Sequence, residues 1–282
     1  MYLAVPRPAC LRWLTAACVT TVCALTAASA AAAATSGRED LPPGRDGVLA
    51  TTEEADCYEV TIVRSVPIDK ARALVPDRYT LAQTSSTTTA PMWIINIHCD
   101  RTSVDDHPPQ RTSTTTYVGI QVSARKATPT ADPTPTGFMY LLSIATNNPV
   151  LFAHYRAAGL PVQFDRRANS SETVNADNTS TLAWAFTAEG LDYTVSAQPA
   201  GPLGALEPST TSYWYDNGPR GDLRIRFENL ATVASRVHIV ADFSDASTVA
   251  SLLTEPRFED INAVFGSNFI RGGWTGHIEL LD

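Results

Sequence analysis

Lysine is almost missing from this chain, which carries only Lys70 and Lys126 among its 282 residues. Any reaction that needs a lysine amine, such as Schiff-base formation with a ketone, therefore has two candidates. Arg125 precedes Lys126 and, as an adjacent cation, disfavours the charged ammonium. Lys126 nevertheless opens a polar loop and Lys70 lies on a predicted short helix, so both are expected to be solvated. Lysine-based catalysis is therefore disfavoured.

The chain also has a net negative charge and lacks the residue spacing that is typical of a metal site. The formal net charge of −8 argues against a nucleic-acid or an anionic-membrane partner. The five cysteines and five histidines show no metal-type spacing, so no metal site is predicted. Three of the cysteines precede residue 35, which leaves Cys57 and Cys99 for the folded domain. In an exported protein two cysteines favour one disulfide, the alternative being two buried thiols.

The first 34 residues predict export. Arg7 and Arg12 precede an apolar run that ends in small residues between Ala28 and Ala34, the pattern of a cleaved signal peptide. The alternative is a membrane anchor, for which the run is long enough. We expect a signal peptide over 1–34, a disordered lead-in over 35–54 and one domain over 55–282. The protein is predicted to be secreted, without stable membrane association after cleavage.

Several catalytic signatures are missing. The chain has no Gly-x-Ser-x-Gly elbow between a strand and a helix, which disfavours a Ser-His-Asp hydrolase. Dinucleotide and phosphate-binding fingerprints are absent too, so no cofactor is predicted.

Short β-branched segments dominate what remains. Residues 57–66, 91–99, 114–125, 138–145, 222–228 and 236–243 read as strands, and 181–187 with 191–197 as a hairpin around Glu189-Gly190. Short helices are predicted at 67–75, 245–253 and 257–265. Many short antiparallel strands with few helices indicate a mainly β fold, either a closed barrel or a sandwich.

The most informative stretch runs from Asn147 to Gln163. Asn148-Pro149 marks a helix start, apolar residues then recur at helical spacing, and Gly159 with Pro161 ends the helix. This stretch resembles the acetoacetate decarboxylase superfamily, as does the opening strand, short helix and Val75-Pro76 segment. The resemblance implies a single antiparallel β-barrel. In that superfamily a lysine pair follows this helix and its first member forms the Schiff base, whereas Val162 and Gln163 stand here.

The resemblance also implies an apolar cavity lined by a few polar groups. If the strand face with Asn96 and His98 points inward, as the superfamily's matching strand suggests, both side chains enter the cavity. We predict His98, Asn96 and Asp192 as catalytic residues, although a solvent-facing Asp192 is the simpler alternative. Tyr117, Gln163 and Trp184 are the predicted substrate contacts.

A histidine or a carboxyl group with a second hydrogen-bonding group in a dry pocket suits general acid–base catalysis. In overall character the chain is also similar to the polyketide spiroacetal cyclases of the ossamycin and oligomycin type, which implies cyclisation of an apolar hydroxy-ketone without a cofactor. Two alternatives stay open: a secreted barrel that binds an apolar small molecule without catalysis, and an acetoacetate decarboxylase-like lyase. Ionisable groups with perturbed pKa values inside the cavity would favour chemistry, and an all-apolar lining would favour binding.

Overall fold

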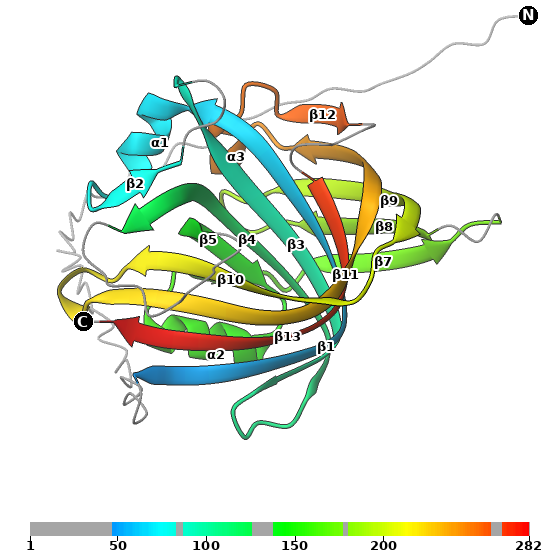
Figure 1. The fold of residues 1–282 in the computed structure, drawn as a ribbon, viewed down its shortest axis with the longest axis horizontal. Helices are drawn as coiled ribbons and strands as arrows, with labels where there is room; N and C mark the ends of the chain where they lie inside the picture. The colour runs from blue at the N-terminus through cyan, green and yellow to red at the C-terminus, as the bar shows by residue number, and fades with distance from the viewer. Residues whose placement is uncertain (1–46, 83–86, 126–137, 177–179, 261–266, 282) are drawn as a thin grey trace, which may run out of the picture. The chain divides into compact units, whose positions relative to one another are not determined.

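The structure, a computed structural model, describes residues 47–82, 87–125, 138–176, 180–260 and 267–281 (Figure 1). The chain divides into two units, Met1–Arg38 and Glu39–Asp282, and every described residue belongs to the second. The predicted signal peptide and Lys126 lie outside the described residues. Among the helices of the described part, none is long and apolar enough to cross a membrane.

Strands make up most of the described chain, as predicted. The strands are β1 (Val48–Pro67), β2 (Tyr79–Leu81), β3 (Thr89–Val104), β4 (Gln110–Arg125), β5 (Phe138–Thr146), β6 (Val162–Phe164), β7 (Asn169–Val174), β8 (Ser180–Phe186), β9 (Tyr193–Leu203), β10 (Glu207–Asp216), β11 (Asp222–Phe243), β12 (Arg257–Asp260) and β13 (Ser267–Leu281). The helices are α1 (Ile68–Leu74), α2 (Pro149–Ala158) and α3 (Thr248–Leu252), with a 3-10 turn over Gly218–Arg220.

The strands form one sheet whose main path of pairing returns to its first member. Its order is β10-β5-β4-β3-β1-β13-β11-β9-β8-β7, and β10 also pairs with β11. Seven strands from β10 to β11 therefore make a circuit, and β9, β8 and β7 continue from the far half of the long β11. The predicted antiparallel arrangement is confirmed for most strand pairs, but β10 with β5 and β5 with β6 pair in parallel.

Two hydrophobic cores lie on opposite faces of this sheet. The inner core receives residues from all seven strands of the circuit and from α2, among them Ile95, Tyr117 and Trp274. The outer core lies between the other face of β1, β3 and β4 and the group formed by β8, β9 and the second half of β11. Since β1, β3 and β4 contribute to both cores, their alternate residues enter different environments.

Some predicted elements differ from the structure. β1 begins at Val48, within the segment expected to be a disordered lead-in. The two strands predicted at 222–228 and 236–243 are one strand, β11. The helix predicted at 257–265 is wrong over its described part: Arg257–Asp260 is the strand β12, paired with β11. Phe258 is held there by the guanidinium of Arg64, 3.5 Å from its ring centroid, so tertiary contacts outweigh local propensity.

Helix α2 forms where the sequence predicts it. The Asn148 side chain accepts hydrogen bonds from the backbone N–H groups of Val150 and Leu151 at 3.0 and 3.1 Å, and Pro149 occupies the first turn. Gly159 ends the helix in the left-handed conformation, with φ 102°. Leu151 and Tyr155 are buried, so the helix delivers one face to the inner core.

The predicted disulfide is present between Cys57 on β1 and Cys99 on β3. The two residues are direct partners in the register of the two strands, with Cα atoms 4.0 Å apart. Both belong to the inner core, so the bond crosslinks two strands of the circuit from the inside.

Candidate functional site

Two glutamates of β1 face the inner core. In a regular strand Glu54 and Glu59, an odd number of residues apart, would point to opposite faces. Between them the pairing of β1 with β13 shifts by one residue, and Asp56 adopts a left-handed conformation with φ 55°. This irregularity reverses the alternation, so that Glu54 joins the face that carries Cys57 and Glu59. Such bulges often re-aim side chains at functional sites.

Burial perturbs both carboxyl groups. Glu54 and Glu59 are each only 6% exposed. Burial, together with the negative charge of Glu59, raises the pKa of Glu54 from its ordinary value of 4.5 to about 7. Burial also raises the pKa of Glu59 to about 7. The Thr61 hydroxyl, 2.5 Å from a carboxylate oxygen of Glu59, acts in the opposite direction, because its hydrogen bond favours the charged form.

The Thr61 hydrogen bond and the repulsion between the two carboxylates affect Glu59 and Glu54 differently. The Thr61 hydroxyl stabilises a negative charge on Glu59, and a negative charge on Glu59 in turn disfavours one on Glu54. Near pH 7 the pair therefore holds about one proton between its two carboxyl groups. A pair of this kind offers an acid and a base at the same time near neutral pH.

Three buried tyrosines of the inner core interact electrostatically with the two carboxyl groups. The Tyr117 and Tyr155 hydroxyls are hydrogen-bonded to each other at 2.8 Å. Burial, first, and then the negative charge of Glu54 raise the pKa of Tyr155, and burial followed by Glu59 raises that of Tyr213. Neutral phenol groups, which donate hydrogen bonds, therefore lie within electrostatic reach of both glutamates.

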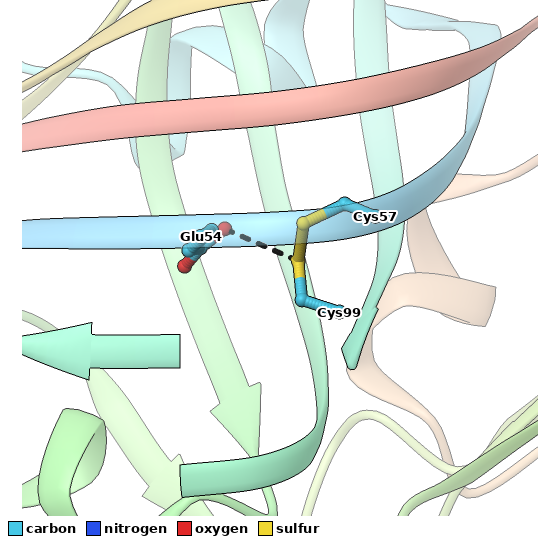
Figure 2. A group of neighbouring side chains, drawn as sticks. All are labelled: Glu54, Cys57 and Cys99. Carbon is cyan, nitrogen blue, oxygen red and sulfur yellow. Dashed lines mark hydrogen bonds between the residues drawn. A yellow bond between two sulfur atoms is a disulfide. The ribbon is translucent and has the colours of Figure 1, made fainter. Parts of the chain in front are cut away.

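Glu54 also faces the disulfide, as Figure 2 shows. Its Oε2 atom lies 3.6 Å from Sγ of Cys99. A disulfide sulfur has no proton, so a hydrogen bond across this contact has to be donated by the carboxylic acid form of Glu54. One carboxyl oxygen and the two sulfurs lie within 4.8 Å of one another. As a donor set for a metal ion this group requires free thiolates, which the disulfide removes.

The predicted catalytic residues Asn96 and His98 lie on the other face of β3. The neighbouring residues Ile95 and Ile97 face the inner core, so the expectation that Asn96 and His98 enter the interior of the circuit is not met. Asn96 is fully buried and accepts a hydrogen bond from the Tyr193 hydroxyl at 2.8 Å. His98 lies at the wall of a separate pocket of about 680 Å³.

The other predicted residues are dispersed. Asp192 is exposed immediately before β9, which matches the simpler alternative, and does not join Asn96 or His98. Gln163 lines a second pocket of about 400 Å³ and donates to the backbone oxygen of Glu189 at 2.9 Å. Trp184 is buried in the outer core, its ring edge-on to Tyr58. Tyr117 alone among the predicted set lies in the carboxyl–tyrosine cluster, which consists of Glu54, Glu59, Tyr117, Tyr155 and Tyr213.

Sequence reasoning missed both glutamates. Glu54 was included in the expected lead-in. Glu59 and Thr61 share the alternating face of Cys57, and a cysteine expected to form an internal disulfide marks that face as buried. The even spacing of Glu59 from Cys57 along the strand is the sequence signal that would have identified Glu59 as buried. For Glu54 the corresponding signal is weaker: Asp56 is a residue type enriched in left-handed conformations within an otherwise extended segment.

Several solved structures are similar to this chain. An acetoacetate decarboxylase from Legionella pneumophila aligns with a TM-score of 0.50 and 10% identity over 86% of this chain and 90% of that chain. Another acetoacetate decarboxylase aligns at 0.49 with 15% identity over 86% and 89%, and the enduracididine biosynthesis enzyme MppR at 0.48 with 10% identity over 82% and 85%. No protein-family model matches the chain, and no curated protein matches its sequence.

The chain has the acetoacetate decarboxylase-like fold, so the predicted resemblance is confirmed for the fold. Val162, at the position predicted for the Schiff-base lysine, packs against the inner core. Lys70 is exposed and donates to the backbone oxygen of Ser251 at 2.7 Å, away from this core. Among the described residues, the ionisable groups of the inner core are carboxyls and phenols in place of an amine.

Proposed function

We propose that this protein is a cofactor-independent general acid–base cyclase of the spiroacetal-forming type, acting on a polyketide hydroxy-ketone. The observation that carries the proposal is the Glu54–Glu59 pair, buried inside the strand circuit with both pKa values raised to about 7. Perturbed carboxyl groups in an apolar interior favour chemistry over simple binding of an apolar ligand. The same interior holds no described lysine, which supports acid–base chemistry over decarboxylation through an imine.

The proposed reaction divides between the two carboxyl groups. The Glu59 carboxylate accepts the proton of the substrate hydroxyl as its oxygen adds to the ketone carbon. Glu54 donates its proton to the ketone oxygen, and in the second ring closure to the hydroxyl that leaves as water. Between the two closures the proton taken up by Glu59 returns to Glu54, so both groups are restored and no covalent intermediate forms. A dihydroxy-ketone is thereby converted to a spiroacetal and one water. Tyr213 and the Tyr117–Tyr155 pair supply neutral donors to the oxygens that change charge.

Turnover of a ring-open dihydroxy-ketone polyketide tests the proposal. Glu59→Gln and Glu54→Gln should each lower the rate by about 10²–10⁴-fold, the range for loss of a general acid or base. Glu53→Gln makes the same chemical change at an exposed neighbour on β1 and should retain the wild-type rate. Product is followed by chromatography and by the loss of one water in mass, and thermal melting of each variant checks that it is folded.

Other outcomes separate the competing hypotheses. Wild-type rates in both glutamate variants, with turnover lost in a His98 or Asn96 variant, would transfer the site to the outer face of β3. Release of carbon dioxide from acetoacetate, with an adduct trapped on a lysine by borohydride, would indicate a decarboxylase-like lyase. Binding of the polyketide without conversion by the wild-type protein would favour a binding barrel.

A further inference from the structure

The pocket beside His98 is separate from the carboxyl–tyrosine cluster, because it lies on the opposite face of β1 and β3. Its wall is formed by the β1 irregularity, by β3, by β7 and by β13. His98 is only 6% exposed, and the Tyr58 ring is stacked on its imidazole with centroids 4.7 Å apart. The pocket volume of about 680 Å³ is in the range that holds a small-molecule ligand.

Both nitrogens of His98 have side-chain partners. Nδ1 lies 2.5 Å from the Ser170 hydroxyl, and Nε2 lies 3.2 Å from a carboxylate oxygen of Asp100. Since a carboxylate only accepts, the neutral imidazole carries its proton on Nε2 and accepts at Nδ1. The Thr114 hydroxyl, 2.7 Å from Ser170 Oγ, then donates to Ser170, which leaves the Ser170 proton directed at His98. This is the order nucleophile, base and orienting carboxylate, with the two ring nitrogens in the reverse of their usual roles.

Ser170 lies on a strand with a free edge. β7 ends the sheet and pairs only with β8 among the described strands. In an antiparallel pair every second backbone N–H points away from the partner, and the β7 residues 170–172 line the pocket. Backbone donors of this kind can stabilise a developing oxyanion. The absence of a Gly-x-Ser-x-Gly elbow argued against a hydrolase. This site differs from such an elbow, because Ser170 lies on the edge of a strand.

We propose that Ser170 is a catalytic nucleophile, activated by His98 and oriented through Asp100, which hydrolyses uncharged carboxylic esters. Ser170 Oγ bonds to the ester carbonyl carbon while its proton passes to His98 Nδ1. The carbon–oxygen bond to the alcohol then breaks, and His98 returns the proton to the leaving alcohol. Water, deprotonated by His98, attacks the resulting acyl-serine and releases the carboxylic acid and free Ser170.

The charge of the pocket determines the class of ester. Asp56, Asp100 and Glu172 line it, and Asp56 is paired with Arg101 at 2.9 Å. The wall therefore keeps the negative charges of Asp100 and Glu172, which would repel a substrate with its own carboxylate. Tyr58, stacked on His98, provides an aromatic surface beside the nucleophile. An uncharged ester with an apolar acyl or alkoxy group fits both features.

A fluorophosphonate probe, which reacts with activated serines, tests the proposal on the purified full chain. Peptide mass spectrometry should locate the label at Ser170, and p-nitrophenyl butyrate should be hydrolysed. Ser170→Ala should abolish both signals, and His98→Gln should slow labelling about 10²–10⁴-fold. Thr173→Ala removes an exposed hydroxyl of the same strand outside the pocket and should label at the wild-type rate.

Asp100→Asn provides a second test that does not depend on a buried residue, since 68% of the Asp100 side chain is exposed. It should slow labelling at least about tenfold while the melting temperature stays unchanged. Equal labelling rates in wild type, His98→Gln and Asp100→Asn would overturn the proposal, because the serine would then be unactivated. Failure of the folded wild-type protein to take the label at Ser170 would overturn it as well.

Discussion

At the scale of single residues, the raised pKa values of Glu54 and Glu59 link stability to pH. A carboxyl whose pKa is about 7 when folded and 4.5 when unfolded keeps a proton in the native state that the unfolded chain has released. The native state binds more protons between these values, so the contribution of these two groups to stability is fully present below about pH 4.5 and is lost as pH rises through 7. Each group lowers the free energy of unfolding by about 1.4 kcal/mol per pH unit at most in this window.

Urea unfolding at pH 5 and pH 8 measures this link. Glu54→Gln and Glu59→Gln should each reduce the loss of stability between the two pH values, because an amide does not ionise. The exposed Glu53→Gln should show the same loss as the wild type. Identical pH dependence in the wild type and in both buried variants would mean that the two carboxyl groups are not perturbed by folding.

The direction in which a residue points was the hardest property to predict from the sequence. The alternation of β3 correctly separated Asn96 and His98 from Ile95 and Ile97. The resemblance then assigned the polar face to the interior, whereas the apolar face lines the circuit. Two buried faces exist on this strand, and alternation identifies the faces without saying which core each one enters.

At the scale of elements, the irregularity in β1 positions the candidate acid. Asp56 has φ 55°, a conformation that glycine adopts freely and that costs a β-branched residue about 1–2 kcal/mol or more.

Asp56→Gly should therefore retain folding and cyclisation. Asp56→Val should lower the free energy of unfolding by about that amount and should also slow cyclisation, because straightening β1 turns Glu54 away from Glu59. Urea unfolding and turnover of the polyketide check both effects. Equal stability and equal rates in the two variants would contradict this role for Asp56.

Elements defined by local rules were predicted well, and those defined by distant contacts were not. Helix α2 follows from Asn148, Pro149 and Gly159, which lie within the helix or at its ends. The strand β12 exists because Arg257–Asp260 pairs with β11 and Phe258 packs against Arg64. No pattern within residues 257–265 contains that information.

At the scale of the whole described domain, the disulfide closes a long loop within the strand circuit. Cys57 and Cys99 are 42 residues apart in the sequence, and chain-entropy reasoning gives a stabilisation of about 4 kcal/mol for a loop of this length. Replacing both cysteines with alanine should lower the free energy of unfolding by about 2–4 kcal/mol. Urea unfolding with and without a reducing thiol is the measurement. The wild type should lose stability on reduction and the double variant should be insensitive to the thiol; an insensitive wild type would contradict the prediction.

The resemblance predicted the mainly β architecture and the acetoacetate decarboxylase-like fold, since those depend on the order and type of elements. The circuit with parallel pairs at β5 and the division into two cores depend on how β11 spans both halves of the domain. The candidate site lies in one of these cores. Its glutamates could therefore be located only once it was known which residues enter which core.

The division of the β1 residues between two cores also constrains how β1 must align with its neighbouring strands. A slip of β1 by one residue against its neighbours would exchange the contents of the two cores: Glu59 would enter the outer core, and Val60 the inner one. In a sheet with one wet face such an error exposes apolar surface to water, whereas here it would move Glu59 from one buried core to the other, away from Tyr213, with which it interacts in the inner core. The polar residues proposed for the chemistry thus also favour one alignment of the strands, because the tyrosines with which they interact lie in the inner core.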